Sequence, residues 1–177
     1  MTPPLDIRYT ANFVSSPAEL LEQLIAQIEW DTRMYSRKTA SFGAPYNYSG
    51  MDYPPIPMHP LLVPICERLN QTLGYDSNNC LINYYPNGES TMGFHSDATE
   101  NLLPSTGIAI VSLGERRTLR FRAKRDRTVM VDRELESGSL IWMSQAVQRE
   151  WQHAIPKTAS DCPRLSLTFR SLIGESA

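Results

Sequence analysis

The 177 residues suffice for one domain with its own core, and 41% of them are hydrophobic and 20% charged. The net charge of −2 excludes a protein that binds nucleic acid through overall basicity, so a phosphate-binding surface would have to be local. No apolar run approaches the roughly 18 residues of a membrane span, no targeting segment is visible, and the three cysteines lack the CxxC spacing of a zinc site, so we expect a cytoplasmic, reduced monomer without membrane contact.

Two helices are predicted, near residues 17–31 and 60–73. The first begins with Ser16, Pro17 and Glu19, which is the pattern of a capping box with proline in the first turn. Apolar residues then recur at helical spacing, so one face should be buried. Gly74 follows the second helix and should end it.

The segment between the helices, residues 36–59, is dense in Gly, Pro, Ser and Tyr. Such a composition is typical of a connecting loop. It also suits a flap that faces a substrate, because loops on a rigid scaffold often carry binding residues. The sequence leaves both interpretations open.

From residue 80 onward, short runs rich in Val, Ile, Leu, Tyr and Phe alternate with turn residues, which predicts about eight strands. Two helices followed by many short strands indicate an α+β fold built on an antiparallel jelly roll. No repeat or linker divides the chain, so residues 1–177 should form a single domain. The strands are expected near 80–85, 92–96, 107–113, 117–122, 128–133, 139–143, 152–155 and 164–172.

The most specific local feature is His95-Ser96-Asp97. Residues i and i+2 of a strand point to one face, so the imidazole and the carboxylate can bind one ion. His153 lies in another predicted strand and can supply a third ligand. Two histidines and one carboxylate leave open positions, an arrangement that suits non-heme Fe(II). Alone, a HxD pair is more often a histidine hydrogen-bonded to a neighbouring aspartate.

The strand at residues 164–170 alternates strictly between two kinds of side chain. Leucine and phenylalanine form one face, and Arg164, Ser166, Thr168 and Arg170 form the other. If the polar face looks at water, the strand is an ordinary amphipathic one. If it looks into the jelly roll, two buried guanidinium groups need an anion, and a dicarboxylate could satisfy both. Asn83 and Tyr85 share a face of another strand and can add hydrogen bonds.

Together these residues resemble the AlkB family of Fe(II)- and 2-oxoglutarate-dependent dioxygenases. The resemblance covers roughly residues 33–173 and rests on motifs in a fixed order. These are Asn83-x-Tyr85, His95-x-Asp97, Arg120-Phe121-Arg122, Gly138-Ser139-Leu140, Trp151-x-His153 and the strand from Arg164 to Arg170.

The resemblance implies a double-stranded β-helix and three reactants or cofactors: Fe(II), 2-oxoglutarate and O2. It implies that His95, Asp97 and His153 bind the iron. Arg164 and Tyr85 would hold the distal carboxylate of 2-oxoglutarate, and Arg170, Asn83 and Ser166 the end near the metal. The implied reaction demethylates N-alkylated bases of DNA or RNA in alkylation damage repair and releases formaldehyde, succinate and CO2.

Because a base inside a duplex cannot reach such a site, the resemblance implies a single-stranded substrate or a flipped base. The family's nucleotide-recognition segment corresponds to about residues 33–59, and the catalytic jelly roll to about 80–173. Phe42, Tyr46, Tyr48 and the ring of His95 are candidates for stacking the base. Glu100 is a candidate for reading it, although the family often has an acidic residue where this chain has Thr99. The family also commonly has asparagine at the position of Ser166.

A basic run between residues 114 and 128 could contact phosphates, or could be a charged strand edge in water. Its members are Arg116, Arg117, Arg120, Arg122, Lys124, Arg125 and Arg127. Two other functions stay open. The same oxygenase chemistry could act on a small molecule or a protein side chain, and a jelly roll can also serve as a binding module without catalysis.

Overall fold

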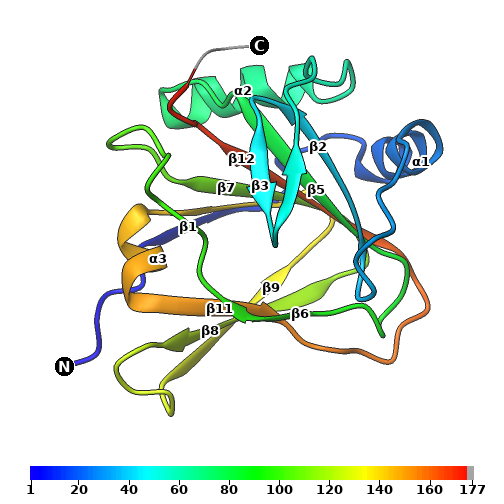
Figure 1. Cartoon of the computed structure of the whole chain (residues 1–177). Coiled ribbons are helices and arrows are strands. Elements are labelled where there is room, and N and C mark those ends of the chain that lie inside the picture. The colour runs from blue at the N-terminus through cyan, green and yellow to red at the C-terminus, as the bar shows by residue number, and fades with distance from the viewer. Residues whose placement is uncertain (175–177) are drawn as a thin grey trace.

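A computed structural model describes residues 1–174 and shows two antiparallel sheets that face each other, with helices on the outside (Figure 1). The larger sheet has six strands in the order β1-β10-β7-β12-β5-β2, and the smaller has four in the order β6-β11-β8-β9. The elements are β1 (Ile7–Thr10), α1 (Pro17–Gln27), β2 (Lys38–Gly43), β3 (Tyr46–Tyr48), β4 (Met51–Tyr53), α2 (Val63–Leu73), β5 (Asn79–Tyr85), β6 (Met92–His95), β7 (Ile108–Gly114), β8 (Arg117–Ala123), β9 (Met130–Leu135), β10 (Leu140–Met143), α3 (Gln145–Glu150), β11 (Trp151–Ile155) and β12 (Arg164–Arg170). The predicted jelly roll is confirmed.

The two faces of the larger sheet carry different cores. Its outer face packs against α1 and α2, and β12 contributes Leu165, Leu167 and Phe169 to that core. Its inner face looks toward the smaller sheet, where Ile110, Phe121 and other apolar side chains form a second core. The alternating polar side chains of β12 therefore point between the sheets, and every residue of this strand is buried. Of the two interpretations of the arginine strand, the structure shows the buried one.

Each of the two predicted helices has one end where the sequence predicted it: α1 its beginning and α2 its end. α1 begins at Pro17, but Ser16 forms no side-chain cap, and the helix ends at Gln27 rather than at residue 31. Ile28 is already extended, and Asp31 forms a β-bridge with Thr39. α2 ends as predicted, because Gly74 adopts the left-handed conformation with φ of 81°. No helix within residues 1–174 is long and apolar enough to cross a membrane.

The segment at 36–59 is not simply a loop, and the jelly roll does not begin at residue 80. β2 pairs with β5 at the edge of the larger sheet, and β3 with β4 forms a hairpin that reaches toward β6 (Figure 1). β2 escaped prediction because its inward-facing residues are Thr39 and Ser41, so it lacks the apolar alternation of a core strand. β1 and the short α3 were also not predicted.

Candidate active site

The first group of site residues comes together where β6 pairs with β11. In this register His95 lies directly opposite His153, and their ring centroids are 4.3 Å apart. Asp97 follows two residues after His95, and its Oδ1 lies 3.4 Å from the His95 Nε2. One ligand atom from each of the three side chains lies within 4.8 Å of the others. The structure thus brings together the three residues that the sequence predicted as metal ligands.

Charge and burial keep two of these three groups in the form that a metal binds. Burial lowers the pKa of His153 to about 4, so its imidazole is neutral and a lone pair is available. Burial alone would raise the pKa of Asp97, but the guanidinium of Arg170 and the hydrogen bond with His95 hold it well below its usual range. For His95, burial acts to lower the pKa, and its contact with Asp97 outweighs this and raises it.

The backbone around Asp97 is anchored to the segment that carries His153. The backbone N–H of Asp97 donates to the Oε1 of Gln148 at 2.9 Å, and the hydroxyl of Ser96 donates to the carbonyl of Trp151 at 2.7 Å. Gln148 belongs to α3 and is 2% exposed. Neither partner was predicted, because a glutamine in a short polar stretch carries no sequence signal for this contact.

The second group of site residues lies on β12 and β5, whose register places Arg164 opposite Tyr85 and Ser166 opposite Asn83. These side chains and the triad of His95, Asp97 and His153 line one cavity between the sheets. It is lined by Tyr48, Leu81, Asn83, Tyr85, Met92, His95, Asp97, Ile110, Leu119, Leu135, His153, Ile155, Arg164, Ser166, Thr168 and Arg170. Both arginines thus reach the same space from opposite ends of one strand.

Several buried donors in this cavity have no partner among residues 1–174. They are the Nε and Nη1 of Arg164, the same two atoms of Arg170, and the hydroxyl of Tyr85. An uncompensated buried guanidinium is costly, and burial lowers the pKa of Arg164. A carboxylate at each end of a small ligand would satisfy these donors, so the residues present fit 2-oxoglutarate. The short Ser166 is compatible with this, because it leaves space between the two arginines.

The basic run does not form one exposed positive surface. Arg117 is 1% exposed and donates to the backbone carbonyls of Ser90 and Pro156, beside Tyr85. The expectation that this residue contacts phosphate is therefore wrong. The other members are exposed or half-buried and mostly have partners of their own: Arg116 with Glu134, Arg120 with Asp132, Arg125 with Glu150, Arg122 with Gln152, and Lys124 with the carbonyl of Gln148. This pattern favours the charged strand edge over the phosphate-binding surface.

A wider, open cavity of about 440 Å³ adjoins the triad between the β3–β4 hairpin and β6. Tyr46 and Tyr48 line it from the hairpin, and His95 and Asp97 from the other side. Arg37 also lines it and was not predicted. Its Nε donates to the Oδ1 of Asn83 at 2.8 Å, and its Nη2 donates to the hydroxyl of Tyr48. Arg37 therefore connects this cavity with the one that holds the arginines of β12.

Two of the predicted substrate residues lie elsewhere. Phe42 points to the helix side of β2, where it packs into the outer core and against the ring of His59. Phe42 lies on the opposite face of β2 from Thr39 and Ser41, which point inward, so its ring cannot stack a base in this cavity. Glu100 is exposed and is not among the lining residues, which end at Ala98.

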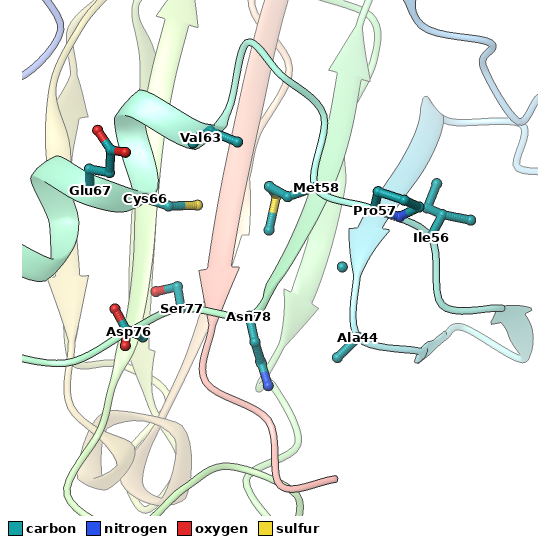
Figure 2. A pocket seen from close by; sticks show the side chains of 11 residues that line it. Ala44, Ile56, Pro57, Met58, Val63, Cys66, Glu67, Asp76, Ser77 and Asn78 are labelled. Atoms are coloured by element: carbon teal, nitrogen blue, oxygen red, sulfur yellow. The ribbon is translucent and has the colours of Figure 1, made fainter. Parts of the chain in front are cut away.

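A separate cavity of about 310 Å³ lies between α2 and the segment that follows β4 (Figure 2). Its walls include Ile56, Met58, Val63 and Cys66, whose thiol points into it (Figure 2). Burial raises the pKa of Cys66 to about 11, so this thiol stays protonated at neutral pH. None of the residues of the candidate active site lines this cavity.

Comparison with known proteins agrees with the geometry. The family model described as "2OG-Fe(II) oxygenase superfamily" matches residues 7–170. The human alpha-ketoglutarate-dependent dioxygenase alkB homolog 3 is 34% identical over 173 residues, which cover 86% of this chain and 60% of that protein. The human DNA oxidative demethylase ALKBH2 is 31% identical over 193 positions, which cover 96% of this chain and 74% of that protein. The structure of OsALKBH1 shares the fold with a TM-score of 0.66 at 16% identity, over 97% of this chain and 100% of that one. The chain belongs to the 2OG-Fe(II) oxygenase superfamily.

Proposed function

We propose that this protein is a dioxygenase that oxidatively demethylates N-alkylated bases in DNA or RNA. One observation carries the proposal: the triad lines a single buried cavity together with two arginines, each of which has nitrogens without a partner among the described residues, and this cavity opens beside an aromatic-walled one. The names of the two human relatives, which describe an alkB homolog and a DNA oxidative demethylase, support the same substrate class.

The residue roles follow from position. His95, Asp97 and His153 would bind Fe(II), which with 2-oxoglutarate and O2 supplies the oxidation of an N-alkyl carbon. Arg164, with the hydroxyl of Tyr85, would bind the distal carboxylate of 2-oxoglutarate.

The near end of the cosubstrate would meet different groups. Arg170 lies 3.3 Å from Asp97 through its Nη2, so its unpartnered nitrogens can bind a carboxylate beside the metal. The Oδ1 of Asn83 accepts from Arg37. This fixes the amide so that its N–H groups are left to donate to the cosubstrate.

The open cavity would receive the base. Tyr46, Tyr48 and His95 present rings on two of its sides, and a flipped or single-stranded base could stack between them. We propose that the protein acts as a monomer in a reducing, cytoplasmic environment, which fits its free thiols.

The test is mass spectrometry of nucleosides after the protein, Fe(II), ascorbate and 2-oxoglutarate are incubated with a panel of methylated oligonucleotides. We expect loss of the methylated nucleoside, with formaldehyde and succinate formed in equal amounts. Succinate without loss of any methylated base would favour a small molecule or protein side chain as substrate. No succinate at all would contradict the proposal and favour a non-catalytic module.

A further inference from the structure

The open cavity beside the triad has a buried arginine, Arg37, in the wall that carries Tyr48. Arg37 is only 9% exposed, yet it lines the cavity. Four of its five N–H groups are used by Asn83, Ser36, Thr91 and Tyr48. The remaining N–H belongs to Nη2, the nitrogen that donates to Tyr48 at the cavity wall.

Both tyrosine rings of this cavity already have a guanidinium over them. The Arg170 carbon Cζ lies 4.6 Å from the centroid of the Tyr46 ring, and that of Arg37 lies 5.6 Å from the centroid of the Tyr48 ring. The attraction of an aromatic ring for a cation comes from the negative potential of its faces. A guanidinium nearby weakens that potential. At the Tyr48 ring the charge of Arg37 has no carboxylate partner among the described residues, so this ring suits an uncharged partner better.

No free carboxylate among the described residues that line this cavity offsets the positive charge. Asp97 is the one acidic residue in the lining, and it contacts both Arg170 and His95. Asp52 bonds to Asn47 on the hairpin and lines a different cavity. Glu100 is exposed and outside the lining.

We propose that the cavity selects an uncharged alkylated base with a carbonyl oxygen on each side of the alkylated nitrogen, over a cationic base that has an amino group on one of these sides. N3-methyluracil represents the first kind, and N3-methylcytosine, which is protonated at neutral pH, the second. The remaining N–H of Arg37 would donate to the carbonyl oxygen that lies where the cationic base has its amino group, because an amino group there offers no acceptor. This inference rests on the proposed function.

The test compares two oligonucleotides that differ only in these two bases. Binding to the full chain, loaded with Fe(II) and 2-oxoglutarate under argon so that no turnover occurs, is followed by fluorescence anisotropy, with the unmodified strand as reference. We expect the N3-methyluracil strand to bind at least about tenfold more tightly, which corresponds to about 1.4 kcal/mol. Equal affinities, or tighter binding of the N3-methylcytosine strand, would overturn the inference.

A substitution that adds a charge to the lining of the open cavity provides a second test. Ala98 is exposed at the edge of the cavity, so Ala98→Asp places a carboxylate there at little cost in packing. We expect the preference for N3-methyluracil to fall at least threefold in this variant and to persist in Ala98→Asn, which adds a side chain of similar size without charge. An unchanged ratio in Ala98→Asp would show that charge is not the cause and would refute the inference.

The two proposals fail differently. If both strands bind but no succinate forms when air is admitted, the proposed function is wrong, while the ratio of affinities still decides the charge preference. If both bases are demethylated and the cationic one binds more tightly, the function stands and the charge preference is wrong.

Discussion

The amide oxygen of Gln148 accepts a hydrogen bond from the backbone N–H of Asp97 at 2.9 Å. This bond, from a helix that no sequence pattern predicted, fixes the backbone of Asp97, whose carboxylate is a proposed metal ligand. Groups that orient ligands in this way typically change metal affinity by 10- to 100-fold when they are removed.

We therefore expect Gln148→Ala to weaken Fe(II) binding by about tenfold or more. Titration with Mn(II) followed by electron paramagnetic resonance measures the affinity without turnover. Gln152→Ala is the matched control, because this glutamine contacts Arg122 and not the triad. Equal Mn(II) affinities in the two variants would contradict the assigned role of Gln148.

Asp97→Ala should abolish iron-dependent decarboxylation of 2-oxoglutarate, since the change removes one of three ligands. It also leaves Arg170 without its carboxylate partner, so thermal unfolding of the variant must be measured alongside. Folded protein with undiminished succinate production would refute the metal assignment.

Arg164→Ala should raise the Michaelis constant for 2-oxoglutarate by roughly 10- to 100-fold, because a charged hydrogen-bonded pair is worth about 1.5–3 kcal/mol. The control is Arg116→Ala, which removes the same kind of charge from an exposed position paired with Glu134. A Michaelis constant that responds equally to the two substitutions would argue against a distal carboxylate site at Arg164.

The stability of the metal-free protein should fall as the pH is lowered from about 6.5 toward 4. His153 is buried and its pKa in the folded state is about 4, so between these values the unfolded chain binds a proton that the folded chain does not. The resulting decrease in the free energy of unfolding is at most about 3 kcal/mol. It is measured by urea unfolding across this range, and the slope should flatten in His153→Asn but persist in His59→Asn.

Phe42→Ala should lower the free energy of unfolding by roughly 2 kcal/mol without weakening the binding of a methylated oligonucleotide, because Phe42 packs in the outer core. Tyr46→Ala should weaken that binding, since Tyr46 lines the open cavity. If Phe42→Ala reduced affinity as much as Tyr46→Ala at equal folded fraction, the placement of the two residues would be contradicted.

The features that the sequence predicted correctly are those that depend on short-range periodicity. The spacing of His95 and Asp97 and the alternation of residues 164–170 determine which side chains share a face, and the structure confirms both. Phe42 was placed wrongly because its face is set by the pairing of β2 with β5, which involves residues about 40 positions apart. Arg37 and Gln148 were missed for a similar reason, since their partners are distant in sequence.

Arg37 lies between the buried cavity that the arginines of β12 line and the open cavity beside the triad. Through Asn83 it borders the space for the cosubstrate, and through Tyr48 the space for the base. A displacement of this guanidinium would move both the amide of Asn83 and the hydroxyl of Tyr48, so a ligand that moves Arg37 in one cavity would also change the other. We therefore expect 2-oxoglutarate and the alkylated base to change each other's affinity through this side chain.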